Sequence, residues 1–415
     1  MDIYADVRAL CESAKKASRV MALASETQKN KLLHTLAAFL CENSESIIEA
    51  NNKDLDLAEA NGVPKPMLDR LMLNDSRIKG IADSLISVAA LDDPIGKGDV
   101  WSRPSGIAIR RIRVPLGVVG IIYEARPNVT VDSAALCLKT GNAVVLRGGK
   151  EAINTNKALV KIIKMALSNC GFDEGTVELI QSTDRESANA LMSMRGLVDV
   201  LIPRGGKGLI NACVQNSKVP VIETGAGNCH LYIDESADLD KAIKIAVNAK
   251  CSRPSVCNAI ETILVHSAVA ESFLPMLERA FAEYNVDIRG CARVCSVIKA
   301  SPVTDEDFAT EYDDYIVAVG VVDSVDEAID HINKYSTGHS EAIVTENMNS
   351  AHAFMNRIDS VAVYVNASTR FTDGGEFGFG AEIGISTQKL HVRGPMGLMA
   401  LTTEKYLIAG NGAIR

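Results

Sequence analysis

Short apolar segments alternate with amphipathic ones along most of this chain from Gly117 onward, and this alternation restricts the fold more than any other feature. A first series of strands is predicted at 118–122, 143–146, 177–180, 198–202 and 219–222, with helices between them. A second series of strands is predicted near 229–233, 259–266, 315–322, 341–345 and 361–366. Regular strand–helix alternation is typical of parallel sheets with helices on both faces, so we expect an α/β fold with two parallel-sheet domains.

Two regions lie outside this alternation. Residues 1–95 have helical periodicity, and Ser25-Glu-Thr-Gln28 is a capping box at the start of one helix. In segment 107–113, isoleucines alternate with Arg110, Arg111 and Arg113, which predicts a strand with a charged face that is too polar for the centre of a sheet. Gly225-Ala-Gly227 lies between the two series of strands and is the predicted domain boundary.

The composition excludes several classes of protein. The 415 residues suit two domains, and 47% hydrophobic with 23% charged residues is ordinary for a globular enzyme. A net charge of -9 argues against nucleic acids and anionic membranes as partners, because both bind basic surfaces. We expect no signal peptide and no membrane span, and therefore a cytoplasmic location. Ten cysteines without a CxxC pair predict reduced thiols and no metal site.

A polar loop, Glu124-Ala-Arg-Pro-Asn-Val-Thr130, directly follows the first buried strand. Ligands in open α/β sheets collect at the carboxyl ends of strands, so Arg126 and Asn128 are candidates to face a ligand. An equally good interpretation is that Pro127 and Asn128 only cap the helix that follows.

Cys257 lies at a loop–strand junction, with Lys250 and Arg253 close in sequence to favour its thiolate, and this arrangement suits a nucleophile. A given cysteine among ten is more often a small core residue. The remaining nine are interpreted in that way, including Cys251. His331 and His339 are interpreted as structural.

Three glycine-rich loops are candidates to bind nucleotide phosphates, because backbone N–H groups that open a helix attract anions. Their candidate cofactor-binding residues are Arg147, Lys150, Arg204, Gly205, Gly206, Gly225 and Gly227. Strand–helix turns often need glycine for packing alone, so each glycine could also be purely structural. The four cationic residues at the first two loops, Arg147, Lys150, Arg204 and Lys207, favour anion binding. The segment Asn366–Arg370 is a candidate wall for an acidic substrate, or else an ordinary polar turn.

Long motifs in a fixed order extend from the first helices to the C-terminus. Pro115-Leu-Gly-Val-Val-Gly120, Gly141-Asn-Ala-Val-Val-Leu146 and a cysteine before a strand resemble the aldehyde dehydrogenase superfamily. A closer similarity, to its acyl phosphate reductases, depends on longer motifs. These are Tyr123-Glu-Ala-Arg-Pro-Asn-Val-Thr-Val-Asp132, Leu201-Ile-Pro-Arg-Gly-Gly206, Arg253-Pro-Ser-Val-Cys-Asn258, Ala328-Ile-Asp-His-Ile332, Ser336-Thr-Gly-His-Ser-Glu341 and Val365-Asn-Ala-Ser-Thr-Arg-Phe-Thr-Asp-Gly-Gly375.

The resemblance implies that Cys257 is the acyl-accepting nucleophile and that Asn128 is an oxyanion donor. It places Arg147 at a cofactor-binding position and Arg204-Gly205-Gly206 at a cofactor-phosphate turn. The substrate-binding residues expected from the resemblance and from the loops are Arg126, Arg253, Asn366, Ser368, Thr369 and Arg370. Glu223 falls near the general-base position of hydrolytic members, a role that acyl phosphate reduction does not need.

The resemblance also implies domains and partners. Residues 1–105 and 118–228 would bind the cofactor, residues 229–390 would form the catalytic domain, and residues 106–117 and 398–415 would form an oligomerisation arm. The implied activity is NADPH-dependent reduction of L-glutamate 5-phosphate to L-glutamate 5-semialdehyde, by a homodimer or homotetramer coupled to glutamate 5-kinase. Two alternatives stay open: a hydrolytic aldehyde dehydrogenase that uses Glu223 as base, and a catalytically silent nucleotide-binding assembly protein.

Overall fold

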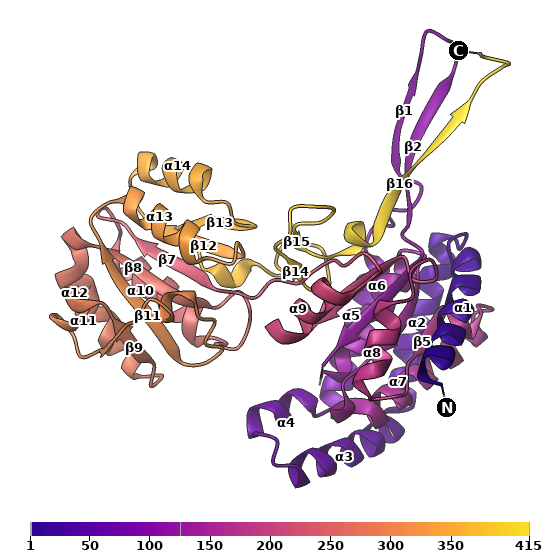
Figure 1. Cartoon of the computed structure of the whole chain (residues 1–415), viewed down its shortest axis with the longest axis horizontal. Helices are drawn as coiled ribbons and strands as arrows, with labels where there is room; N and C mark the ends of the chain where they lie inside the picture. The colour runs from indigo at the N-terminus through magenta and orange to yellow at the C-terminus, as the bar shows by residue number, and fades with distance from the viewer. Residues whose placement is uncertain (1, 125, 415) are drawn as a thin grey trace. The chain divides into compact units, whose positions relative to one another are not determined.

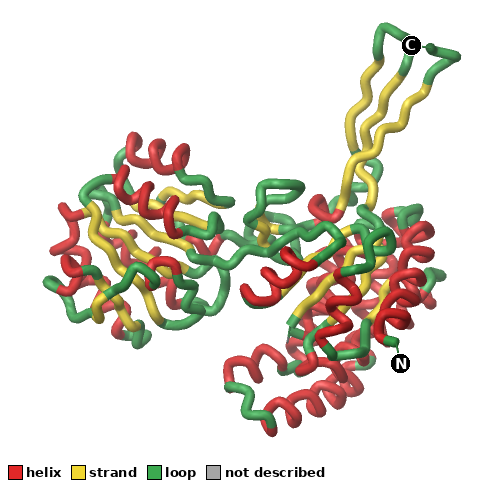
Figure 2. The backbone as a smooth tube through the Cα atoms, viewed as in Figure 1, coloured by secondary structure: helices red, strands yellow, loops and turns green. Residues whose placement is uncertain are grey.

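The computed structural model describes residues 2–124 and 126–414, and the chain forms two compact units. Unit 1 consists of residues 1–224, 378–384 and 396–415, and unit 2 consists of residues 225–377 and 385–395. Figures 1 and 2 show helices packed around a sheet in each unit. The predicted α/β fold with two parallel sheets is confirmed. No helix in the described part of the chain is long and apolar enough to cross a membrane.

Unit 1 begins with the helices predicted over residues 1–95. They are α1 (Ile3–Met21), α2 (Glu26–Glu42), α3 (Ser44–Ala60), α4 (Lys65–Leu71) and α5 (Asp75–Ala90). The predicted capping box is present at α2: the Gln28 backbone N–H donates to Ser25 Oγ over 3.3 Å, and the Ser25 N–H donates to Gln28 Oε1 over 2.9 Å. Such a box satisfies two N–H groups that a helix start leaves without a partner.

A four-stranded parallel sheet forms the centre of unit 1, in the order β5-β4-β3-β6. Its strands are β3 (Val118–Tyr123), β4 (Ala143–Arg147), β5 (Val177–Leu179) and β6 (Val200–Arg204). They alternate with α6 (Pro127–Lys139), α7 (Ile153–Asn169), α8 (Arg185–Met192) and α9 (Lys207–Asn216). The strand expected at 219–222 is wrong. This segment makes a single bridge, between Val221 and Leu201, because Pro220 has no N–H to donate to a ladder.

An antiparallel sheet of three strands extends from the body of unit 1 (Figure 1). Strand β2 (Ala108–Pro115) lies between β1 (Gly98–Ser102) and the C-terminal β16 (Thr402–Ala409). The strand predicted at 107–113 is therefore present, but the sequence analysis missed β1, all of whose residues are exposed. We refer to these three strands as the arm.

Unit 2 contains a seven-stranded parallel sheet in the order β10-β9-β11-β8-β7-β12-β13. The strands are β7 (Cys229–Ile233), β8 (Ile260–His266), β9 (Asp287–Gly290), β10 (Ser301–Pro302), β11 (Ile316–Val322), β12 (Ser340–Val344) and β13 (Ala362–Val365). The helices are α10 (Leu239–Cys251), α11 (Ser267–Ala282), α12 (Ala292–Cys295), α13 (Val325–Tyr335) and α14 (Met348–Arg357). A short antiparallel pair, β14 (Ile385–Ser386) with β15 (Gly394–Pro395), completes the unit. The five strands predicted here are confirmed, whereas β9 and β10 were not predicted.

A buried ion pair lies within unit 2. Lys250 Nζ, at the end of α10, donates to Glu261 Oε2 on β8 over 2.5 Å, and both side chains are almost fully buried. Burial raises the pKa of the Glu261 carboxyl, while the Lys250 ammonium acts in the opposite direction. Since this ammonium is paired with Glu261, Lys250 holds together the two elements that flank Cys257.

We expect Lys250→Met to lower the free energy of unfolding of unit 2 by about 3–5 kcal/mol, because it leaves a carboxyl buried without its cation. A carboxyl whose pKa is raised by folding binds its proton more tightly in the folded state, so stability falls as pH rises above its unfolded pKa. The loss should therefore be larger at pH 8 than at pH 5 in urea denaturation. The double variant Lys250→Met/Glu261→Leu should regain most of the stability; a double variant as unstable as Lys250→Met would contradict the assignment.

Candidate active site

Cys257 lies in the turn between α10 and β8, and its side chain is half-buried. The next residue is fixed by four contacts within unit 2. Asn258 Nδ2 donates to the carbonyl oxygens of Arg370 (3.3 Å) and Thr372 (2.9 Å). Thr369 Oγ1 donates to the Asn258 carbonyl oxygen over 2.6 Å, and Arg370 Nη1 donates to Asn258 Oδ1. Thr369 is thus a buried support of the turn rather than an exposed ligand group.

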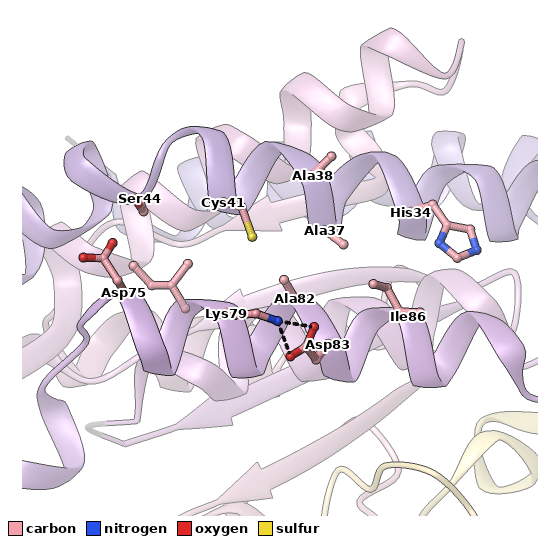
Figure 3. Close-up of a pocket in the computed structure, with 11 residues that line it drawn as sticks. His34, Ala37, Ala38, Cys41, Ser44, Asp75, Lys79, Ala82, Asp83 and Ile86 are labelled. Carbon is pink, nitrogen blue, oxygen red and sulfur yellow. Dashed lines mark hydrogen bonds and ion pairs between the residues drawn. The ribbon is translucent and has the colours of Figure 1, made fainter.

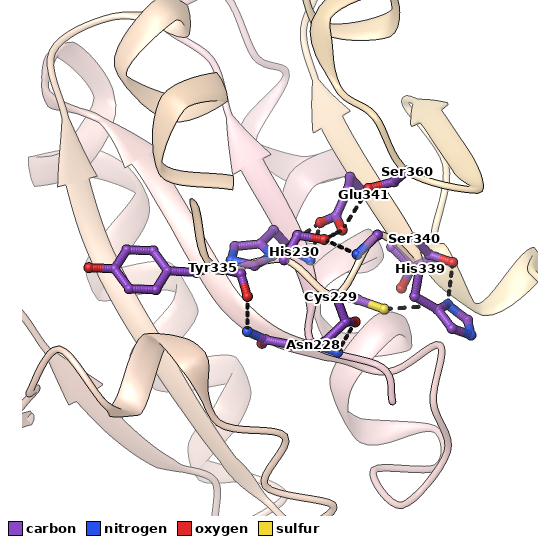
Figure 4. A network of polar contacts seen from close by, with 12 residues as sticks. Asn228, Cys229, His230, Tyr335, His339, Ser340, Glu341 and Ser360 are labelled. Atoms are coloured by element: carbon purple, nitrogen blue, oxygen red, sulfur yellow. Dashed lines mark hydrogen bonds and ion pairs between the residues drawn. The ribbon is translucent and has the colours of Figure 1, made fainter. Parts of the chain in front are cut away.

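The start of β7 supports Cys257 from the other side. A Cβ atom at Gly227 would lie 1.6 Å from the carbonyl oxygen of Cys257 and 2.4 Å from its Cα, so only glycine fits. Cys229 Sγ, fully buried, donates to the same carbonyl oxygen over 3.1 Å and lies 3.7 Å from His339 Nδ1 (Figure 4). Burial raises the pKa of the Cys229 thiol well above its ordinary value, which keeps it a neutral donor. The turn that carries Cys257 is therefore held between β7 and Asn258.

Two cations lie close to this turn. Burial lowers the pKa of the Arg370 guanidinium and Arg253 acts in the same direction, whereas Asp373 and a negative Cys257 sulfur act in the opposite direction. Arg370 therefore lies within electrostatic range of both Arg253 and Cys257. By contrast, burial raises the pKa of the Cys251 thiol to about 11. The Cys257 side chain is also the more exposed of the two, since Cys251 is buried.

The segment Asn366–Arg370 follows β13. The Asn366 side chain bridges to β12: its Oδ1 accepts from the Thr345 N–H and its Nδ2 donates to the Thr345 carbonyl oxygen, both over 2.9 Å. Ser368 Oγ accepts from the Arg370 N–H over 3.3 Å. These contacts order the segment and present Arg370 beside Cys257.

Asn128, in unit 1, lies in the first turn of α6 and is exposed. The N-cap residue of α6 is Arg126, and no side chain makes a capping hydrogen bond there, so the interpretation of Asn128 as a cap is wrong. Instead, Asn128 Nδ2 donates to Asp132 Oδ2 over 3.0 Å. Ala125 of the predicted polar loop lies outside the described residues. Asp132 was missed by the sequence analysis, although it lies one helical turn after Asn128.

The glycine-rich loops of unit 1 make specific contacts of their own. Arg147, at the end of β4, donates through Nη2 to the carbonyl oxygens of Thr183 (2.7 Å) and Asp184 (3.0 Å). Lys150 is exposed and begins the next helical turn. Gly206, the N-cap of α9, donates its N–H to Glu124 Oε2 over 3.0 Å, and a Cβ at Gly205 would lie 2.6 Å from the same carboxylate. The turn that follows Arg204 is thus already packed against Glu124.

The predicted residues fall into two groups. Unit 2 holds Cys257, Arg253, Arg370, Gly225 and Gly227, whereas unit 1 holds Asn128 with the cofactor candidates of β4 and β6. In unit 2, Gly225 packs against Thr387: a Cβ at Gly225 would lie 2.3 Å from Thr387 Cγ2. The Gly225 N–H donates to the Ile385 carbonyl oxygen. No group of His, Cys, Asp and Glu side chains in the described ranges could hold a metal ion.

A separate groove of about 470 Å³ lies between α2 and α5 of unit 1 (Figure 3). It is lined by His34, Cys41, Lys79 and Ile86 among others, and Lys79 pairs with Asp83 there. None of the predicted site residues lines it.

Comparisons with known proteins show the family and the fold of the chain. A sequence profile of the aldehyde dehydrogenase family matches residues 3–316 and 295–381. The gamma-glutamyl phosphate reductase of Clostridium acetobutylicum is 56% identical over 417 aligned residues, which cover 100% of both chains. The crystal structure of the gamma-glutamyl phosphate reductase of Thermotoga maritima superposes with a TM-score of 0.96 at 48% identity, covering 99% of each chain. An acetylating aldehyde dehydrogenase of Geobacillus thermoglucosidasius, at 18% identity and a TM-score of 0.72, shares the fold.

We expect Gly227→Ala to lower turnover by about 100-fold, because the new methyl group displaces the backbone that fixes Cys257, and displacements near 1 Å can cost that much. The rate at which iodoacetamide labels Cys257 should change as well. Gly80→Ala is a matched control, since a Cβ at Gly80 meets nothing within 4 Å. Equal turnover in the two variants would mean that Gly227 does not position Cys257.

Proposed function

Because this chain belongs to the aldehyde dehydrogenase family and, within it, to the gamma-glutamyl phosphate reductases, we propose that it reduces L-glutamate 5-phosphate to L-glutamate 5-semialdehyde and phosphate through a thioacyl intermediate on Cys257. It is an oxidoreductase of amino-acid biosynthesis that acts on a small molecule and uses a nicotinamide cofactor. The observation that carries the proposed mechanism is a half-buried Cys257 on a fixed turn, next to Asn258, which the Arg370 guanidinium contacts.

The reaction begins with attack of the Cys257 thiolate on the acyl carbon of the substrate. The bond from that carbon to the phosphate oxygen breaks, the phosphate leaves with the electron pair, and a thioester remains on Cys257. The nicotinamide, when bound, supplies a hydride to the thioester carbon. The carbon–sulfur bond of the resulting hemithioacetal then breaks, which releases the aldehyde and regenerates the Cys257 thiolate.

Asn128 and the backbone N–H of Cys257 are the proposed donors to the oxyanion that develops on the acyl oxygen. The Asn128 amide suits this role because it is exposed, and its Nδ2 has one N–H directed to Asp132 and a second N–H to offer. Loss of one such donor typically costs about 3 kcal/mol of barrier.

Arg253 and Arg370 are the proposed partners of the substrate's anionic groups, together with Arg126. The protein carries a net charge of -9, so an anionic substrate must bind at local cations. Arg370 is well suited because its guanidinium is partly buried and held by Ser252 Oγ (3.1 Å) and Asn258. Asn366 and Ser368 keep the segment before Arg370 in place.

The proposed cofactor is NADP(H), bound by Arg147, Lys150, the Arg204-Gly205-Gly206 turn and the Gly225–Gly227 segment. The residues fit an anionic nucleotide: the end of β4 presents the exposed Lys150, and β6 ends in Arg204. Arg147 would contribute to cofactor binding in two ways: its positive charge would attract the nucleotide, and its hydrogen bonds hold the Thr183–Asp184 loop in place. Two cations at the β4 end favour a cofactor with the additional 2′-phosphate.

We further propose that the protein forms a homodimer or homotetramer through the arm, in the cytoplasm, and is coupled functionally to glutamate 5-kinase. The arm supports assembly because its exposed side chains include Val100, Trp101, Tyr406 and Ile408. Large apolar side chains gathered on an exposed sheet are typical of contact surfaces between subunits. Light scattering of the purified protein distinguishes a dimer from a tetramer.

The assay that tests the function is reduction of NADP by L-glutamate 5-semialdehyde, with and without phosphate. We expect turnover only when phosphate is present, because phosphate must release the acyl group from Cys257 in this direction. A hydrolytic aldehyde dehydrogenase would turn over without phosphate, and a silent assembly protein would not turn over at all. NAD in place of NADP, in the same assay, tests the proposed cofactor.

We expect Cys257→Ala to abolish this phosphate-dependent reaction while nucleotide binding and the thermal unfolding midpoint are kept. Cys251→Ala is the matched control and should keep most of the activity, because the Cys251 thiol is buried and its pKa is about 11. Iodoacetamide should label Cys257 first, and substrate should protect it. An active Cys257→Ala variant, or a loss confined to Cys251→Ala, would overturn the assignment of the nucleophile.

A further inference from the structure

The Asn128 amide has two ends of opposite character. Its Nδ2 group carries two N–H donors, and its Oδ1 only accepts, while the outlines of the two ends are nearly the same. An oxyanion is stabilised only by the donor end. A rotation of the amide by 180° would therefore replace an attractive contact with a repulsive one, so something must hold the donor end in place.

Asp132 is placed to do this. Both residues lie on α6 one turn apart, and Asn128 Nδ2 donates to Asp132 Oδ2 over 3.0 Å. An ionised carboxylate accepts hydrogen bonds and donates none. It can therefore bind the Nδ2 end of the amide, whereas a rotated amide would bring Oδ1 against a negative oxygen. One N–H of Nδ2 is held by Asp132, and the other remains directed away from it.

The surroundings of Asp132 limit how its charge acts. Burial raises the pKa of this carboxyl to about 6, while the Asn128 hydrogen bond and the Arg204 guanidinium lower it. The group is therefore ionised at neutral pH. The nearby positive charge of Arg204 also offsets the repulsion that a carboxylate would exert on an oxyanion.

We propose that Asp132 is a positioning residue of the reaction: its carboxylate keeps the Asn128 amide in the orientation that donates to the developing oxyanion. This inference rests on the oxyanion role proposed above for Asn128. Interaction with the helix dipole does not explain Asp132, because it lies in the second turn of α6, beyond the first turn where the dipole favours acidic residues.

Four variants of the full chain test the inference: Asn128→Ala, Asp132→Ala, Asp132→Asn and Asn128→Ala/Asp132→Ala. We expect Asp132→Ala to lower kcat by about 10- to 100-fold, as removal of an orienting partner typically does, with the KM for cofactor changed by less than about twofold. Asp132→Asn, nearly identical in shape, should also lose turnover, because its amide can pair with either end of Asn128. In the Asn128→Ala background, Asp132→Ala should cause no further loss.

Asp83→Ala is the matched control, because Asp83 accepts a contact from Lys79 one turn away on α5 and lies outside the proposed site. It should leave kcat unchanged. Thermal unfolding identifies any variant that fails to fold, and Asp132→Asn then decides the test. If Asn128→Ala keeps its turnover, the proposed role of Asn128 fails. If Asn128→Ala loses turnover while Asp132→Ala and Asp132→Asn keep theirs, the positioning role of Asp132 is wrong. It is also wrong if the loss in Asn128→Ala/Asp132→Ala equals the product of the losses in the two single variants.

Discussion

The arrangement of unit 2 depends on the contact between the backbones of Gly227 and Cys257. A Cβ at Gly227 would lie only 1.6 Å from the Cys257 carbonyl oxygen, so the segment before β7 and the turn before β8 are in direct backbone contact. This contact requires both segments to be fixed. Thr337 Oγ1 accepts from the Asn228 N–H over 3.0 Å, the Gly227 N–H donates to Glu311 Oε1 over 2.6 Å, and the Asn258 side chain joins the opposite side to the Arg370 segment.

The core of unit 2 near the Cys257 turn contains several polar side chains, and each of those described below has a partner. Figure 4 shows His230, whose Nδ1 lies 3.1 Å from Glu341 Oε2, and Asn228, whose Nδ2 donates to the carbonyl oxygen of Tyr335 over 2.8 Å. Asn228 Nδ2 also donates to the carbonyl oxygen of Phe308 over 2.8 Å, and Lys250 pairs with Glu261. Paired groups like these keep neighbouring elements in one arrangement, because a shift would leave a buried charge or donor without its partner. An apolar core of the same volume would tolerate more displacement at Cys257.

The sequence predicted the parallel strands well because buried strands are continuous apolar runs, as in Val118–Tyr123. It missed β1 because an exposed antiparallel strand has no such run, and it placed a strand at 219–222 because periodicity ignores the missing N–H of Pro220. At the site, residue type and loop position made Cys257 and Asn128 candidates, and the family resemblance supplied the roles proposed for them. Spacing could not reveal that Gly227 packs against Cys257, or that Lys250 pairs with Glu261, because those contacts join segments whose approach is set by the whole sheet.

The arm joins parts of the chain that are made at very different times. Arg113 on β2 donates to Thr402, 289 positions later, and β16 is the final strand of the chain. A ribosome that synthesises the protein must therefore finish nearly the whole chain before β2 gains its second neighbour. Until then, β2 has one strand edge open, and its three arginines discourage premature pairing with other nascent chains. Completion of the arm must therefore wait until the 289 positions that separate Arg113 from Thr402 have been synthesised.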